Sequence, residues 1–253
     1  MPEVRPLREE GAVDLTRLYL DLLGRDAEGD RPHTGLNMVA SADGRATLRG
    51  TADIGTRTDR ALLKHLRSLV DAVMVGAGTL RANDFTPRVT SRETLERRDL
   101  AAREAQPIAI VVSHLGAVPL DRKFFALPQE RIVVVSEHAA DEARRALRDA
   151  GATVVALGST EVDLPAFLRW LAASRGTRML LCEGGPHLAG RLLAARALDE
   201  VFLTQSWRVT GEPDALSWVE SGAMLDGVHL EPLEAYEGDG ERYGRFRVTY
   251  SER

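Results

Sequence analysis

The sequence predicts an α/β domain whose central sheet is mostly parallel and has helices on both faces, with an antiparallel hairpin at its C-terminal edge. Apolar runs of strand length alternate with amphipathic helical segments between residues 34 and 206, which is typical of a buried parallel sheet. Residues 229–250 differ, because two strand-like runs surround a Gly-rich turn there. The second run alternates apolar and polar side chains: Phe246, Val248 and Tyr250 against Arg245, Arg247 and Thr249. This alternation predicts a hairpin with one solvent-exposed face.

The N-terminal part is predicted to be an extension to a single domain. Residues 1–31 form a helical extension and linker, and residues 32–253 form the domain. Within the extension, one helical face carries four large side chains and ends at Gly24; these are Leu15, Leu18, Tyr19 and Leu22. The charged stretch that follows, with Gly and Pro, favours a connecting loop.

The elements of the domain follow in regular order. Strands are predicted at 34–41, 72–75, 107–113, 131–136, 153–158, 178–182 and 199–206. Helices are predicted at 58–70, 137–151, 164–176 and 187–198. We expect Thr58 to cap the first of these helices, and Gly151 and Gly176 to end the second and third. The charged run 93–104 favours a solvated helix.

Composition excludes several classes of function. The 253 residues carry 33 basic and 38 acidic side chains, for a formal net charge of −5, which argues against a nucleic acid as the main partner. No apolar run approaches the roughly 18 residues that a membrane span needs, and residues 1–10 resemble no export signal. Cys182 is the only cysteine, so we expect no disulfide, no thiolate-based metal site and a reducing cytoplasm.

Two glycine turns at strand ends are candidate phosphate sites. Residues 75–79 place Gly76, Gly78 and Thr79 where a backbone can approach a ligand and a hydroxyl can reach it. The alternative interpretation is a tight strand-to-helix turn without a ligand. The motif also lacks the spacing of an ordinary dinucleotide fingerprint, and the chain has no Walker motif, no G-x-S-x-G elbow and no H-E-x-x-H.

The second turn lies in residues 182–190. Gly184 and Gly185 free the turn and Pro186 suits a first helical position, so the amides of residues 187–190 are expected to face an anion such as a pyrophosphate. Glu183 would repel phosphates, which directs it to another part of the ligand. A simple helix start with an exposed Glu183 is the alternative. A third turn, residues 42–45, is expected to form through bonds of Asp43 to its own backbone.

Together these segments resemble the reductase family of riboflavin biosynthesis, the C-terminal half of bifunctional deaminase-reductases. The matching motifs are S-A-D-G at 41–44, D-A-V-M-V-G-A-G-T at 71–79, Q-P-I-A-I-V-V-S at 106–113, L-L-C-E-G-G-P-H-L-A-G at 180–190 and L-D-E-V at 198–201. The likeness extends over residues 35–250. It implies a dihydrofolate-reductase-like fold and a homodimer. The deaminase signature has no counterpart, so the chain is similar to a stand-alone reductase.

The resemblance implies a role for each matching position. With the glycine turns, it places NADPH on Ile54 (backbone), Gly76, Gly78, Thr79, Asn83, Ser113, Gly184, Gly185, Pro186, His187, Leu188, Ala189 and Gly190. It places the substrate on Arg67, Glu183 and Arg88, beside a loop containing Ser41 and Asp43. Arg67 suits an anionic substrate group, with a helix-surface ion pair as the alternative. His114 and Arg88 lie in stretches that could read the 2′-phosphate of NADPH.

The expected activity is hydride transfer from NADPH to a heterocyclic or ribosyl substrate, of the 5-amino-6-(5-phosphoribosylamino)uracil reductase type. Either Glu183, with a pKa raised by burial, or a water supplies the proton. Three segments depart from the family: Asn37 stands where many members have Lys, and residues 82–85 and 205–211 differ. Two alternatives therefore stay open: a pterin, dihydrofolate or other substrate for the same fold and cofactor, or a nucleotide-binding module without turnover.

Overall fold

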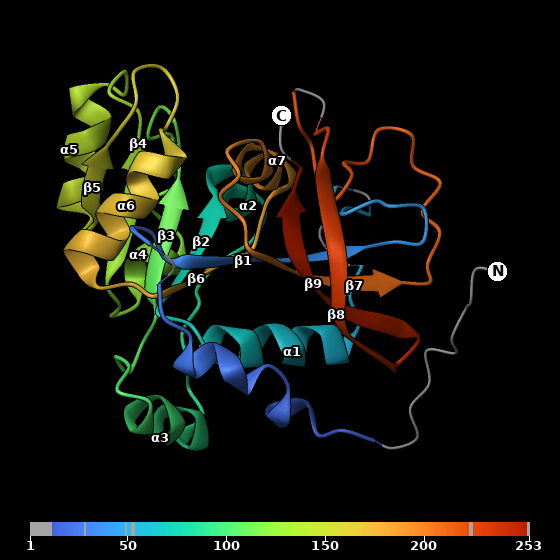
Figure 1. The fold of residues 1–253 in the computed structure, drawn as a ribbon. Coiled ribbons are helices and arrows are strands. Elements are labelled where there is room, and N and C mark those ends of the chain that lie inside the picture. Colours follow the sequence, from blue (N-terminus) through green and yellow to red (C-terminus); the bar gives the residue numbers. More distant parts are fainter. Residues whose placement is uncertain (1–11, 28, 49, 52–53, 223–224, 252–253) are drawn as a thin grey trace.

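A single sheet organises the part of the chain that the computed structural model describes, which is residues 12–27, 29–48, 50–51, 54–222 and 225–251. Across these residues the strand order is β5-β4-β3-β2-β6-β1-β7-β9-β8 (Figure 1). The strands are β1 (His33–Ala40), β2 (Ala72–Gly76), β3 (Ile108–Val112), β4 (Arg131–Val135), β5 (Thr153–Ala156), β6 (Met179–Cys182), β7 (Glu200–Ser206), β8 (Val228–Gly238) and β9 (Glu241–Tyr250).

The fold class predicted from the sequence is confirmed. Every pairing from β5 to β7 is parallel, and β9 joins β7 and β8 in antiparallel pairs. The helices are α1 (Arg57–Ser68), α2 (Ala77–Ala82), α3 (Arg92–Leu100), α4 (Lys123–Ala126), α5 (Asp141–Asp149), α6 (Leu164–Arg175) and α7 (Pro186–Ala194). Gly151 and Gly176 follow α5 and α6 with φ of 81° and 61°, a left-handed conformation that glycine adopts at low cost.

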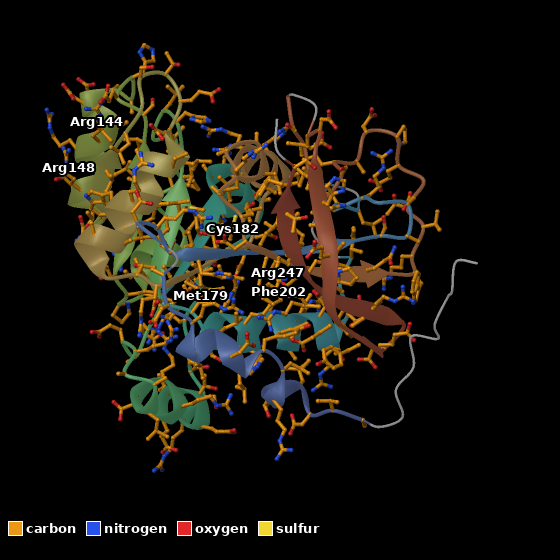
Figure 2. The ribbon with its side chains drawn as sticks, viewed as in Figure 1. Arg144, Arg148, Met179, Cys182, Phe202 and Arg247 are labelled. Atoms are coloured by element: carbon orange, nitrogen blue, oxygen red, sulfur yellow. The ribbon has the colours of Figure 1, made fainter. Side chains whose placement is uncertain are left out.

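Helices cover both faces of the sheet because the strands are apolar on both sides. One buried cluster joins the strands to α6 and α7 and contains Cys182. The other joins them to α1 and α5 and contains Met179 and Phe202. Figure 2 shows these three side chains inside the molecule, whereas Arg144 and Arg148 of α5 lie at its outer edge. No helix among the described residues is long and apolar enough to cross a membrane.

The N-cap of helix α1 lies two residues earlier than predicted, and the helix itself begins at Arg57 instead of residue 58. Thr56 is extended, with ψ of −173°, and its side chain accepts a bond from the Asp59 amide, so Thr56 and not Thr58 is the N-cap. The carboxylate of Glu241 on β9 in turn accepts bonds from the Thr56 amide at 2.8 Å and from its hydroxyl at 2.6 Å. These contacts fix the start of α1 to the C-terminal hairpin.

The predicted N-terminal helix is wrong in form. Residues 14–24 make two short 3-10 helices, Leu15–Arg17 and Leu20–Gly24, because Tyr19 between them is left-handed with φ of 58°. The break places the ring of Tyr19 5.1 Å from the ring of Phe202. This segment therefore joins the core of the domain.

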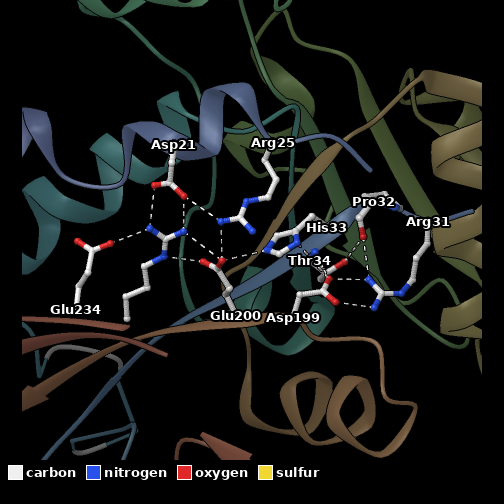
Figure 3. Close-up of polar contacts among 10 residues, drawn as sticks. Asp21, Arg25, Arg31, Pro32, His33, Thr34, Asp199, Glu200 and Glu234 are labelled. Atoms are coloured by element: carbon white, nitrogen blue, oxygen red, sulfur yellow. Dashed lines mark hydrogen bonds and ion pairs between the residues drawn. The ribbon is translucent and has the colours of Figure 1, made fainter. Parts of the chain in front are cut away.

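The same segment overturns the expected solvent-exposed face of the hairpin at Arg245. Its guanidinium lies against Glu200 of β7 at 2.7 Å, and the side chains of both residues are only 4% exposed. Asp21 of the N-terminal segment covers this pair and accepts two bonds from Arg245 at 2.7 and 2.8 Å (Figure 3). Arg247, two residues along β9, stays 61% exposed.

Helix α3 is likewise less solvated than its charges predicted. Arg98 is fully buried, and its guanidinium donates to the carbonyls of Ser68, Val70 and Glu104. These three carbonyl acceptors offset part of the cost of burying the charge, and burial lowers the pKa of Arg98 to about 10. The arginine thus ties α3 to the end of α1.

Candidate active site

A cavity of about 860 Å³ opens at the carboxyl ends of β1, β2, β3 and β6, which is where open α/β sheets bind their ligands. The starts of α2 and α7 form one wall. The opposite wall is one face of α1, along which Asp59, Leu63 and Arg67 follow each other every four residues. The predicted site residues that line this cavity are Arg67, Gly76, Gly78, Thr79, Asn83, Ser113, Glu183, Gly185, Pro186, His187 and Leu188.

The two glycine turns lie side by side in one wall of the cavity. The Gly76 amide donates to the Gly184 carbonyl at 2.9 Å, so the turns after β2 and β6 are hydrogen-bonded. The Gly184–Gly185 peptide bond is cis, and Gly184 has φ of 77°. A Cβ on Gly184 would lie 2.6 Å from Met38 Sδ, so only glycine fits there. Gly184 thus shapes the turn from behind the cavity.

Fewer backbone amides at the start of α7 are available to a ligand than the sequence predicts. The Ala189 amide donates to the Gly185 carbonyl at 3.0 Å inside the helix. A Cβ on Gly190 would lie 2.1 Å from the Glu220 carbonyl oxygen, so Gly190 packs against a loop instead of the cavity. The amides of His187 and Leu188 remain as the donors that a helix start leaves without internal partners.

Glu183 and Arg67 form a bidentate ion pair inside the cavity. Arg67 Nε lies 2.6 Å from Oε1 of Glu183, and Nη2 lies 2.7 Å from Oε2. Burial favours a neutral Arg67, but the charge of Glu183 and its hydrogen bonds outweigh burial and raise the pKa of Arg67. The third nitrogen, Nη1, donates to the Thr86 carbonyl at 3.2 Å. A carboxylate held by two charge-assisted bonds is a poor proton donor, which weighs against Glu183 as the acid.

Ser41 and Asp43 lie beyond the cavity lining, in the turn after β1. The expectation that Asp43 bonds its own backbone is wrong: its carboxylate accepts from the hydroxyl of Ser41 at 2.6 Å and from the amides of Thr210 and Gly211. These bonds, with that of Ser41 the largest, hold the pKa of Asp43 well below its ordinary value. The pair therefore fixes the 207–211 loop beside the site.

Two more predicted residues lie outside the cavity lining. Ile54 is fully buried, while its neighbour Gly55 lines the cavity. Arg88 lies in the loop after α2, and its Nε is buried without a hydrogen-bond partner among the described residues. Arg88 therefore does not line the cavity, and its predicted contact with substrate or nucleotide stays a prediction.

The cavity also contains charged residues that sequence analysis did not single out. Asp59, Arg81 and Arg191 belong to no motif, so only tertiary structure brings them to the lining. A helical projection could have found Asp59, because it lies eight residues before Arg67 and therefore on the same face of α1.

Basic side chains gather at the β3 side of the cavity, where His114 and Arg191 both line it. Arg191 Nη1 lies 3.2 Å from His114 Nε2, and Nη2 donates to the Val162 carbonyl at 2.6 Å. Burial and then the charge of Arg191 lower the pKa of His114. Arg81 of α2 reaches the same side and donates to the Ala117 carbonyl at 3.0 Å.

The donors present fit an anionic dinucleotide. The start of α7 offers two amides with the favourable end of the helix dipole. Across from it, a Cβ on Gly185 would lie 3.1 Å from Thr79 Oγ1, so the space beside Thr79 stays open only because residue 185 has no side chain. A diphosphate could be held there, with Arg81 and Arg191 on its β3 side.

Comparison with known proteins agrees with this geometry. Residues 32–241 match the RibD C-terminal domain family. A 2,5-diamino-6-ribosylamino-4(3H)-pyrimidinone 5′-phosphate reductase of Archaeoglobus fulgidus is 30% identical over 206 residues, which are 81% of this chain and 93% of that protein. The reductase of the same name from Methanothermobacter thermautotrophicus is 31% identical over 210 residues, with the same two coverages.

Solved structures agree on the fold. A pyrimidine reductase-like protein of Corynebacterium diphtheriae superposes with a TM-score of 0.79 at 22% identity, covering 87% of this chain and 93% of that one. The riboflavin biosynthesis reductase Rib7 of Saccharomyces cerevisiae gives a TM-score of 0.68 at 18% identity, covering 93% and 98%. The resemblance inferred from the turn motifs is confirmed: the chain belongs to the RibD C-terminal domain family of riboflavin-biosynthesis reductases.

Proposed function

We propose that the chain is an NADPH-dependent reductase of a phosphoribosylamino pyrimidine. One observation carries the proposal: the phosphate-type turns at Gly76 and Gly185 open onto the same cavity as the Arg67–Glu183 pair. A nucleotide and a second anionic molecule can thus meet in one space. The named relatives act on a ribosylamino pyrimidinone 5′-phosphate, which supports this class of substrate.

The strand order suggests how the coenzyme lies. We place its diphosphate at the amides of His187 and Leu188 and at Thr79, between β2 and β6. The adenosine half then extends over β3, where Ser113 and His114 line the cavity and Arg191 can meet the 2′-phosphate. This leaves the nicotinamide half toward β6 and β1.

The substrate half of the cavity lies over β1 and along α1. Asn37 and Val39 line it from β1, and Arg67 and Glu183 close it near β6. Arg67 offers its planar fork to a phosphate only if Glu183 releases it or shares it. Glu183 can in exchange accept hydrogen bonds from the amino groups of a pyrimidine.

When bound, the coenzyme supplies a hydride. A ribosylamino group has no double bond at its anomeric carbon, so that carbon accepts a hydride only after the sugar ring opens to a C=N form. The nitrogen then needs a proton. The chain's part is therefore to align the substrate over the nicotinamide, exclude water and provide that proton.

Turnover with purified protein tests the proposal. NADPH oxidation should occur with the 2,5-diamino-6-ribosylamino pyrimidinone 5′-phosphate or with its deaminated uracil counterpart, and the product should gain two hydrogens by mass spectrometry. Dihydrofolate serves as the comparison substrate. NADPH binding without reduction of any of the three compounds would favour the nucleotide-binding module, and preferential turnover of dihydrofolate would favour the pterin alternative. The cytoplasmic location and the homodimer stay predictions.

A further inference from the structure

Asp59 lies on the cavity wall formed by α1, two helical turns from Arg67. Eight residues along a helix correspond to roughly 12 Å, so Asp59 and the Arg67–Glu183 pair flank the substrate half of the cavity. Leu63 lies between them on the same face. A substrate held by Arg67 would therefore extend along α1 toward Asp59.

The surroundings of Asp59 favour its acid form. Its neighbours come from three elements: Arg60 on α1, Thr204 on β7, and Glu241 with Tyr243 on β9. Burial raises the pKa of Asp59 to about 6; the Thr204 hydroxyl bond lowers it, the charge of Glu241 raises it, and the charge of Arg60 lowers it. The acid is therefore still present near neutral pH.

Glu241 is well placed to exert this effect because its carboxylate is fixed. It is 1% exposed and accepts bonds from the Thr56 amide, the Thr56 hydroxyl and the Tyr243 hydroxyl at 2.8, 2.6 and 2.9 Å. All three donors are neutral. The negative charge of Glu241 thus lies close to Asp59, and none of these three donors brings a positive charge to offset it.

The other two carboxyl groups on the described cavity lining are already paired with cations. Glu183 accepts both of its bonds from Arg67. Asp84 lies at the rim, where the Lys123 amide donates to it at 2.8 Å and the Lys123 ammonium lies 3.1 Å away. The Lys123 amide bond, followed by its side chain, lowers the pKa of Asp84. Asp59 is the remaining carboxyl group of this lining.

We propose that Asp59 is the general acid of the reduction, the residue that gives its proton to the nitrogen of the substrate's C=N bond. This inference rests on the proposed function. As the hydride brings two electrons to the carbon, the C=N π bond breaks, the nitrogen takes the proton from the Asp59 carboxyl, and C–H and N–H bonds form. The carboxylate then regains a proton from water. An acid whose pKa lies near the working pH is efficient in this role.

Replacing Asp59 by Asn tests the role directly. Asp59→Asn should lower kcat by about 100-fold or more and change the NADPH dissociation constant, read from tryptophan fluorescence, by less than about twofold. The kcat of the wild type should fall above about pH 6, and the variant should lose this limb. Asp141→Asn removes a first-turn acid from α5, far from the cavity and 84% exposed, and should behave as the wild type.

Two further variants should shift the pKa of Asp59 and keep its carboxyl group. Glu241→Gln removes a negative charge beside Asp59, so the inflection of the pH profile should move to lower pH. Thr204→Val removes a bond that favours the carboxylate, so the inflection should move to higher pH. NMR titration of the Asp59 side-chain carbon in the protein without coenzyme should follow the same order.

The outcomes separate this inference from the proposed function. A wild type that oxidises NADPH, together with an Asp59→Asn variant of equal kcat and unchanged pH profile, overturns the role of Asp59 alone. An Asp59 carbon that titrates at the ordinary value for an aspartate overturns it as well, even where a variant folds poorly. A wild type that reduces no ribosylamino pyrimidine overturns both.

Discussion

Gly185 and Thr79 face each other between two helix starts, so closely that a Cβ on Gly185 would lie 3.1 Å from the Thr79 hydroxyl oxygen. The absence of a side chain at this position leaves the helix amides of α7 open to an anion. This relationship joins two turns that are more than a hundred residues apart in the sequence. It also gives the most direct test of coenzyme binding.

Gly185→Asp should weaken NADPH binding by about tenfold or more, because it adds bulk and negative charge where we place the diphosphate. Calorimetry of NADPH binding measures the effect. Gly24→Asp adds the same group at a position with no heavy atom within 4 Å of the new Cβ and should bind as the wild type. Equal affinity in the two variants would contradict the placement of the diphosphate.

Glu183→Gln should reduce turnover more than coenzyme affinity. The neutral side chain gives up the two charge-assisted bonds to Arg67, so Arg67 loses the partner that orients it on the substrate side. We expect kcat to fall about tenfold or more while NADPH affinity changes by less than about twofold. Glu130→Gln breaks an Arg–Glu pair with Arg175 at the surface and is the control. Parallel losses in kcat and affinity would place Glu183 on the nucleotide.

Arg191→Gln should discriminate between the two nicotinamide coenzymes. If Arg191 meets the 2′-phosphate, its loss raises the dissociation constant of NADPH by about tenfold and hardly affects that of NADH, which lacks this group. Fluorescence titration with both coenzymes measures the ratio. Arg175→Gln, a change on α6 away from the cavity, should leave the ratio as it is. An equal loss for NADPH and NADH would assign Arg191 a structural role.

Arg245→Met should destabilise the fold by about 3 kcal/mol or more, because Glu200 keeps a buried charge after losing its closest partner. Arg247→Met, on the same strand but 61% exposed beside Glu231, should cost less than about 1 kcal/mol. Urea unfolding of the two variants provides the comparison. Similar free energies of unfolding would contradict a stabilising role of the buried Arg245–Glu200 pair.

Local signals explain what the sequence predicts correctly. The glycine turns, Pro186 at the start of α7 and the stops at Gly151 and Gly176 depend on backbone conformation within a few residues. The parallel sheet and its two apolar faces follow from the alternation of apolar strands with helices, whereas the order of the strands comes from the structure alone. The sheet, most of the helices and the two glycine turns could therefore be predicted from the sequence, and their binding of phosphate stays a prediction.

Tertiary contacts explain the rest. The alternation of apolar and polar residues in β9 predicts that Arg245 is exposed to solvent. The left-handed turn at Tyr19 brings the N-terminal segment with Asp21 over it, which no local pattern indicates. Asp59 reads as an acid in the first turn of a helix, a common place for one. Its environment comes from Thr204 and Glu241, which no local pattern connects to it.

Among the strands whose carboxyl ends meet the cavity, β6 lies between β2 and β3 on one side and β1 on the other. In the arrangement that we propose, the adenosine and diphosphate parts of the coenzyme and the substrate therefore depend on separate sets of strands. Substitutions on β1, such as one at Asn37, should therefore change the substrate specificity and leave coenzyme binding intact. Relatives can thus acquire new substrates through changes on the β1 side of the cavity, and the same side can be redesigned by itself.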